Sequence, residues 1–199
     1  MHAQNVRTNR LELVSLGRAF LIASLEGRLA DAAEILGARV PGEWPGEASG
    51  SVRRRLEQIE REPDAQPWLM RAIVVREPEP RMVGYVNFHA PPGPRAFVEI
   101  GYRIFPDDRR RGYAEEAARG LLDWASRQPG VRRFRASVRP TNAPSLRLIE
   151  KLGFQQVSSQ WDDEDGVELV FERPARQGDA SFGPTSRKRG RCWALTSSV

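Results

Sequence analysis

Three consecutive arginines stand immediately before a glycine in the segment RRRGYA. The alanine-rich residues that follow have the spacing of an amphipathic helix, so the glycine would lie at a helix N-terminus. Free backbone N–H groups and the positive end of the helix dipole favour an anion there, and a residue without Cβ lets a large anion approach. The sequence therefore predicts a diphosphate cradle, with a solvated basic loop as the alternative reading. Its members are Arg109, Arg110, Arg111, Gly112, Tyr113 and Ala114.

The elements that must position this cradle alternate between helical and strand patterns. Gly37 is the expected C-cap of one helical segment, Ser51 the expected N-cap of another before Pro63, and Asn142 the expected N-cap of a helix that ends at Gly153. The order predicts a mixed α/β domain. In chain order, the expected elements are a strand (10–16), helical segments (15–37 and 52–62), three strands (68–75, 81–89 and 95–105), a helix (114–125), a strand (134–138), a helix (143–152) and a β-hairpin (154–173).

Most of the net positive charge lies in the C-terminal residues of the sequence. Of the net charge of +5 over 199 residues, +4 belongs to the residues from Ala175 onward. Residues 174–199 have little apolar periodicity, so we expect a domain at 1–173 followed by a basic, disordered tail. No apolar run approaches the ~20 residues that span a bilayer, so no membrane partner is expected. The single cysteine, Cys192, excludes an intramolecular disulfide and favours a cytoplasmic location.

The R-x-x-G-x-A turn, the order of the elements and the downstream segment TNAPSLRLIEKLGF together resemble the GNAT superfamily of acyl-CoA-dependent N-acetyltransferases. The strand VEIGYRI, with N-x-x-S and LGF, is similar to the branch that contains the ribosomal-protein N-terminal acetyltransferases. The resemblance covers about residues 8–173 and is most specific from Val98 to Phe154. It implies a GNAT-like fold: a central, mostly antiparallel, twisted sheet with a splay between two strands, flanked by helices. It also implies acetyl-CoA as cosubstrate, and no metal ion.

The resemblance also implies where acetyl-CoA would bind. In that family the acetyl-pantetheine arm meets free backbone groups at the splay, here near Ile104 and Phe105. Backbone amides from Arg109 through Ala114 would hold the diphosphate. Asn142 matches the family asparagine that contacts the arm; a simple helix N-cap is the alternative, and the two roles are compatible.

Acetyl transfer to an amine needs a neutral amine, donors for the oxyanion, and protonation or stabilisation of the departing thiolate. Since Cys192 lies in the tail, we expect direct attack in a ternary complex and not an acetyl-cysteine. Glu99 interrupts an apolar strand and resembles a family glutamate that acts as base, often through water. A charged residue on a half-exposed strand face is the alternative for Glu99, and His89 is a second, weaker candidate.

The proton donor is less clearly marked. Many relatives carry a tyrosine where this chain has Ile149, four residues after Ser145, so the usual phenolic acid is absent. Ser145 could hydrogen-bond the sulfur instead, as the ribosomal-protein branch suggests, or solvent could supply the proton. A first-turn serine that bonds only backbone is the alternative for Ser145.

The expected enzyme acetylates a primary amine, at a protein N-terminus or on a small molecule. Specificity would come from the N-terminal helices, the loop around Trp44, and the hairpin with Trp161 and the acidic residues 162–165, for which a solvated turn is the alternative. Because the usual tyrosine is missing, a non-catalytic acyl-CoA-binding or regulatory protein is the second hypothesis. A third is nucleic-acid or ribosome contact through the tail segment SRKRGR.

Overall fold

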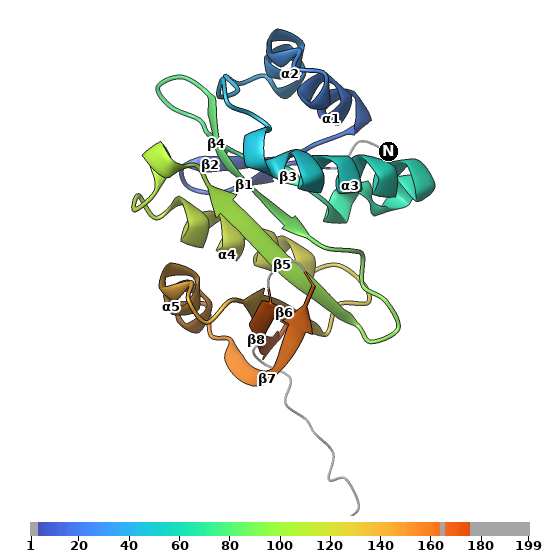
Figure 1. Cartoon of the computed structure of the whole chain (residues 1–199), viewed down its shortest axis with the longest axis vertical. Coiled ribbons are helices and arrows are strands. Elements are labelled where there is room, and N and C mark those ends of the chain that lie inside the picture. Colours follow the sequence, from blue (N-terminus) through green and yellow to red (C-terminus); the bar gives the residue numbers. More distant parts are fainter. Residues whose placement is uncertain (1–3, 164–165, 176–199) are drawn as a thin grey trace, which may run out of the picture.

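A single mixed sheet organises the chain in the computed structural model, which describes residues 4–163 and 166–175. Within these residues eight strands follow the spatial order β1-β2-β3-β4-β5-β6-β8-β7 (Figure 1). All neighbours are antiparallel except β5 and β6, which run parallel. The strands are β1 (Val6–Arg7), β2 (Leu11–Ser15), β3 (Arg71–Val75), β4 (Arg81–Phe88), β5 (Phe97–Ile104), β6 (Arg133–Val138), β7 (Gln155–Asp162) and β8 (Gly166–Pro174).

Helices cover both faces of the sheet and bury a separate apolar cluster on each. One cluster joins α1, α2 and α3 to β3 and β4, and the other joins α4 and α5 to β2, β5, β6 and β8. These faces are called the α3 face and the α4 face below. The helices are α1 (Arg18–Leu25), α2 (Leu29–Leu36), α3 (Ser49–Arg61), α4 (Tyr113–Ser126) and α5 (Ala143–Lys151), with 3-10 turns at Gly46–Ala48, Pro63–Trp68 and Pro106–Asp108.

The pairing of β5 with β6 is short. Only three residue pairs form, Phe97 with Arg133, Val98 with Phe134 and Glu99 with Arg135, although both strands continue beyond them. Because β5 stays paired with β4 up to Ile104, it is β6 that departs. The predicted fold class is thereby confirmed, including the splay between two strands of a mostly antiparallel sheet.

Helix α4 packs on the sheet through the face that its sequence period predicts. Five side chains spaced as expected are buried: Ala117, Ala118, Leu121, Leu122 and Ala125. Because three of these five side chains are alanines, the helix can lie close to β5 and β2, whose apolar side chains complete the cluster. This close packing fixes the position of the N-terminus of α4 beside the end of β5.

A fully buried arginine ties the N-terminal segment to the sheet. Arg71 on β3 donates to the carbonyl oxygens of Gln4 at 2.9 Å and Pro67 at 2.8 Å, and its guanidinium lies 4.9 Å from the ring centroid of Trp124 on α4. Burial lowers the pKa of Arg71 to about 10, so the group still carries its charge at neutral pH. Carbonyl oxygens and an aromatic face solvate that charge in place of a carboxylate.

The local differences from the predicted elements have identifiable causes. The helical segment 15–37 is two helices, α1 and α2, and Gly37 closes the second with φ of 69°, as expected for a C-cap. Helix α3 begins at Ser49, so Ser51 lies inside it and is not its cap. The Ser49 hydroxyl donates to the carbonyl of Gly46, and the preceding 3-10 turn therefore runs directly into the helix. Strand β1, only two residues long, gives no periodic signal.

The end of the domain lies further along the chain than predicted. Strand β8 includes Pro174, and the next residue, Ala175, is buried and donates its N–H to the carbonyl of Arg132 at 3.0 Å. The predicted boundary after Arg173 is therefore two residues short. The rest of the predicted tail, 176–199, lies outside the described residues. Among the helices of the described part, none is long and apolar enough to cross a membrane.

We predict that a chain ending after Ala175 keeps the melting temperature of the full protein within a few degrees, because no packing of the described domain is removed. A chain ending after Arg173 should melt lower, since it loses the Ala175 hydrogen bond and buried methyl group. Thermal unfolding of the three proteins measures this. Equal melting points for the two shortened chains, or a large loss for the longer one, would contradict the prediction.

Candidate active site

The departure of β6 from β5 opens a pocket between the two strands. It is lined by β5, by the C-terminal half of β6, by the first turns of α5 and by Glu168 of β8. In an antiparallel ladder, alternate residues direct their backbone groups to opposite edges. The N–H of Phe105 bonds to Val83 of β4 and the carbonyl of Glu99 to His89 just after β4, so the backbone groups of Ile100, Tyr102 and Ile104 face the gap.

This geometry revises the predicted backbone site. Ile104 does lie on the open edge, but its carbonyl oxygen already accepts a hydrogen bond from Arg109 Nε at 3.1 Å. Phe105 offers no free backbone group, because its N–H donates to Val83 and its carbonyl accepts from the N–H of Asp108. Its ring packs 6.1 Å from that of Trp44 on the α3 face. The open backbone groups therefore centre on Tyr102, which lies two residues before Ile104 on the same edge of the strand.

Helix α5 closes the pocket from the side. Asn142 is its N-cap, and its side-chain oxygen accepts from the Ser145 N–H at 3.2 Å. Asn142, Ser145 and Ile149 all line the pocket, and Ile149 is fully buried at its base. The structure thus brings Asn142 and Ser145 to the splay, and it confirms the capping part of the Asn142 hypothesis.

The loop from β5 to α4 has the backbone shape of an anion site. Gly112 is the N-cap of α4 with φ of 80°, and no side chain caps that helix end. Arg110 is also left-handed, with φ of 63°. Arg111 donates to the carbonyl of Asp107 at 3.3 Å, while the side chains of Arg109 and Arg110 lie at the exposed surface. N–H groups at an uncapped helix start, beside exposed guanidinium groups, suit a diphosphate.

Arg10, from the turn between β1 and β2, holds this loop in place. Its guanidinium donates to the carbonyl of Arg111 at 3.0 Å and to Glu116 at 2.7 Å, and it lies 4.9 Å from the ring centroid of Tyr113. A Cβ at Gly112 would lie 3.3 Å from Arg10 Nη2. Sequence reasoning missed Arg10, because nothing local in the chain links it to a loop a hundred residues away.

The acidic first turn of α4 does not repel an anion, because both of its carboxylates are paired. Burial favours the neutral form of Glu116, but hydrogen bonds from the Arg10 N–H and guanidinium and from the Thr8 hydroxyl outweigh it, and the net pKa of Glu116 is lowered. The Lys151 ammonium, 2.6 Å from Glu115, lowers the pKa of that carboxyl, helped by Arg119.

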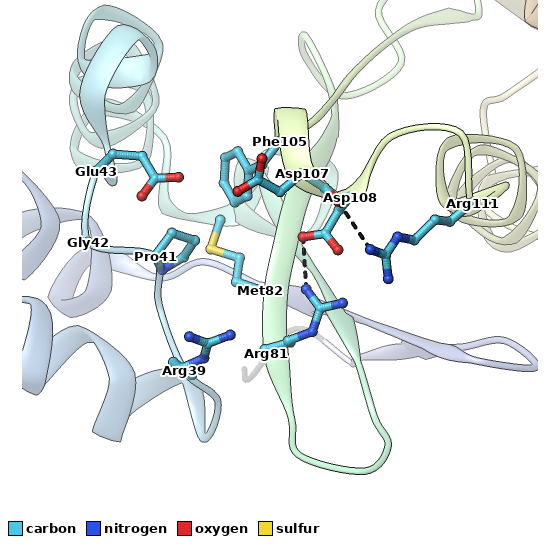
Figure 2. A pocket seen from close by; sticks show the side chains of 10 residues that line it. All are labelled: Arg39, Pro41, Gly42, Glu43, Arg81, Met82, Phe105, Asp107, Asp108 and Arg111. Atoms are coloured by element: carbon cyan, nitrogen blue, oxygen red, sulfur yellow. Dashed lines mark hydrogen bonds and ion pairs between the residues drawn. The ribbon is translucent and has the colours of Figure 1, made fainter.

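A second pocket lies on the other side of the loop, beneath the residues that follow α2. Figure 2 shows Arg39, Arg81 and Arg111 around it, with Arg81 bonded to the buried Asp108 at 2.8 Å. That ion pair holds the 3-10 turn Pro106–Asp108 against β4. Arg39 is exposed, and it extends the positive field around the loop.

The α3 face of the splay carries a polar group that includes Ser137, which also lines the pocket. Glu99 Oε1 accepts from the Ser137 hydroxyl of β6 at 2.5 Å, and Gln160 of β7 donates to Ser137 at 3.3 Å. A Cβ at Gly101 would lie 3.2 Å from His89 Nε2, so the missing side chain makes room on this face. Glu99 and His89, the two predicted base candidates, therefore lie on one face, opposite the buried side chain of Ile100.

His89 is neutral at neutral pH. Although more than a third of its surface is exposed, the protein packed around its ring lowers its pKa, and the charges of Arg55 and Arg54 act in the same direction. The Glu99 carboxylate opposes this shift without reversing it. A neutral imidazole beside a carboxylate is able to accept a proton, so His89 stays a second base candidate.

The remaining predicted residues are divided between core and surface. Trp44 is 3% exposed and donates to the Ser24 hydroxyl at 2.8 Å, so it is a core residue. Trp161 is 73% exposed on the terminal hairpin. Of the acidic turn, residues 164 and 165 lie outside the described residues. Within the described ranges, no group of three or more His, Cys, Asp or Glu side chains is arranged to hold a metal ion.

Comparison with known proteins agrees with this geometry. Residues 28–155 match the sequence profile of the acetyltransferase (GNAT) domain. The uncharacterized N-acetyltransferase YjdG of Bacillus subtilis is 31% identical over 153 residues, which cover 75% of this chain and 88% of that protein.

Solved structures show the same fold. A GNAT-family acetyltransferase of Bordetella pertussis has 26% identity and a TM-score of 0.61, over 85% of this chain and 99% of that one. Mycobacterium smegmatis RimJ, solved with a CoA-disulfide, has 20% identity and a TM-score of 0.60, over 88% of this chain and 90% of that one.

An open-edged strand beside an uncapped, glycine-led helix fits the binding of an acyl-CoA cosubstrate. The chain belongs to the GNAT acetyltransferase family, as its matched profile and its similarity to YjdG show. It is an acetyl-CoA-dependent N-acetyltransferase. The non-catalytic alternative is therefore not adopted.

We predict that Gly112→Glu weakens CoA binding by at least ~3 kcal/mol, more than a hundredfold, because the side chain would occupy and repel the diphosphate position. Gly112→Ala should cost less, although a methyl group there meets Arg10 and disfavours the left-handed backbone by about 1 kcal/mol. Isothermal titration with CoA and a thermal melt of each variant measure the two effects.

The control ligand is 3′-dephospho-CoA, which keeps the diphosphate and should show the same sensitivity to Gly112→Glu. If this variant binds CoA like the parent, the RRRGYA segment is only a solvated basic loop.

We also predict that Glu116→Gln destabilises the protein by about 1–2 kcal/mol at pH 7, because hydrogen bonds from Arg10 and Thr8 are weakened. Since the folded-state pKa lies below its ordinary 4.5, this carboxylate stabilises the fold above that pH, and its contribution is lost as the pH falls through the folded value. Urea unfolding at pH 7 and pH 3 should show the difference shrinking in acid.

The matched control for this experiment is Glu115→Gln, one residue away. Its ion pairs with Lys151 and Arg119 are solvent-exposed, and such pairs contribute about 0–1 kcal/mol. An equal effect of the two substitutions would show that Glu116 does not brace the loop.

Proposed function

We propose that the two sides of the splay have separate tasks: the α4 face receives the arm of acetyl-CoA, and the α3 face receives a primary amine beside Glu99. The observation that carries this proposal is that β5 and β6 pair over only three residues. Beyond these pairs the two strands separate, and the gap connects the two faces of the sheet. Ser137 links the two sides at that opening, because it lines the pocket and donates a hydrogen bond to Glu99. The amine belongs to a protein N-terminus or to a small molecule.

The residues present fit acetyl-CoA. The N–H groups of the loop from Arg109 to Ala114 and the start of α4 would hold the diphosphate, since Gly112 leaves them uncovered. The open backbone edge at Tyr102 would pair with the amides of the arm, and Asn142 lies where its amide reaches the same pocket. When bound, acetyl-CoA supplies the acetyl thioester that the amine attacks.

Glu99 is the proposed general base. Ser137 occupies only Oε1, which orients the carboxylate and leaves Oε2 to accept a proton from the amine, directly or through water. A backbone N–H of the open edge would donate to the developing oxyanion. Ser145, in the first turn of α5, would lie on the sulfur side of the pocket.

We expect Glu99→Gln to lower kcat/KM by roughly a hundredfold at neutral pH, with CoA affinity nearly unchanged, because an amide of the same shape accepts no proton. His89→Gln is the matched comparison on the same face and should reduce turnover less. Steady-state kinetics from pH 6 to 9 and CoA titration measure both. Unaltered turnover of Glu99→Gln would assign the base elsewhere, and a larger loss for His89→Gln would assign it to the histidine.

Mass spectrometry tests the proposed function without any assumption about the acceptor. The purified protein is incubated with isotope-labelled acetyl-CoA and either a cell extract or a panel of amines. Label on protein N-termini or on a small-molecule amine supports the proposal and decides between the two classes. Label on hydroxyl groups, or none above a Gly112→Glu control, would contradict it.

A further inference from the structure

Tyr102 directs a buried, unsatisfied hydroxyl into the splay. It lies on β5 between the buried Ile100 and Ile104, with its ring partly buried against the α4 cluster, and it lines the pocket. Its hydroxyl oxygen is inaccessible to solvent, and although the Ser145 hydroxyl lies near enough to lower its pKa, the two groups do not meet the distance and angle limits of a hydrogen bond, and no other described residue does. Since buried polar groups are nearly always paired, this orphan indicates a group that a ligand provides.

The surroundings of the phenol keep it protonated. Burial raises the pKa of Tyr102 above its ordinary value, and the nearby Ser145 hydroxyl only partly opposes that shift. The charged side chains that line the pocket are Arg139 and Glu168, which lie at its β6 and β8 sides, and the α5 residues in it are uncharged. At neutral pH the Tyr102 hydroxyl is therefore a proton donor.

We propose that Tyr102 is the general acid of the acetyl transfer, taking the place of the phenol that many relatives carry at the position of Ile149. The tyrosine that is absent from α5 is thus replaced by one from the facing strand. Tyr102, Ser145 and Ile149 line one pocket, so a hydroxyl from β5 is available in the pocket to which that helix position belongs. The inference rests on the proposed entry of the acetyl-CoA arm into this pocket.

The proton balance follows from these positions. The amine nitrogen forms a bond to the acetyl carbon and loses one proton to Glu99, or to water bound there, on the α3 face. The carbon–sulfur bond breaks, its electron pair stays on sulfur, and the Tyr102 hydroxyl gives its proton to that sulfur, so the thiol leaves neutral. Tyr102 is then a phenolate, and a proton that ultimately comes from solvent restores the phenol before the next turnover.

The decisive measurement uses CoA alone and needs no acceptor. A donor at the sulfur stabilises the thiolate, so the thiol of bound CoA should titrate lower in the parent than in Tyr102→Phe, by about one pH unit. Thiolate absorbance near 240 nm, corrected with CoA-free protein, follows this titration. Ser145→Ala should shift the titration less if Tyr102 is the donor. Tyr85→Phe, on the opposite face, controls for loss of a phenol elsewhere.

Turnover adds a second readout. With an acceptor identified by mass spectrometry, Tyr102→Phe should lower kcat at least tenfold, leave KM for acetyl-CoA within about threefold, and remove the alkaline limb of the kcat profile. A thermal melt and CoA titration of the same variant check folding and binding.

The outcomes separate the two proposals. If neither the parent nor the variant binds CoA, the proposed acyl-CoA site fails. If both bind CoA equally and the thiol titration and kcat profile are unchanged by Tyr102→Phe, the site stands and the assignment of the acid to Tyr102 is wrong. If Ser145→Ala produces the larger shift, the serine is the donor and the proposal for Tyr102 is overturned.

Discussion

The three residue pairs between β5 and β6 are the constraint on which the site depends. With fewer residue pairs, the sheet would separate into two halves. With more pairs, the backbone groups of Tyr102 would be hydrogen-bonded to β6 and no longer open. Parallel pairing at the start of β5 joins the halves, and α5 then occupies the side of the gap. The pocket is therefore a place where secondary structure is left incomplete.

This incomplete pairing gives one strand two chemical faces within a few residues. Glu99 is hydrogen-bonded to Ser137 on one face of β5, while Tyr102 lies on the other face with its hydroxyl buried at the pocket. Because neighbouring strand residues alternate in direction, proton acceptor and proton donor are separated by the sheet itself. The proposed base and the proposed acid are therefore close in sequence but lie in different environments.

How far the sequence could predict this site depends on the range of each interaction. Gly112 and Asn142 were predictable, because helix starts are encoded by adjacent residues. The Arg10 brace and the Ser137–Glu99 bond were not, because both join distant segments through tertiary packing. The open backbone groups lie at Tyr102 and not at Phe105 because of the register of β5 with β4. The alternation of side chains alone does not set that register.

The Arg10–Glu116 contact joins residues 106 positions apart, one in the first turn of the chain and the other at the start of α4. The loop that it shapes is thus assembled by the two halves of the protein together. Loop closure over such a separation is entropically costly, so order in this loop arises only once the N-terminal strands have docked. The proposed binding of CoA therefore depends on the packing of the N-terminal strands as well, because Arg10 supports the proposed diphosphate loop from a distant part of the sequence.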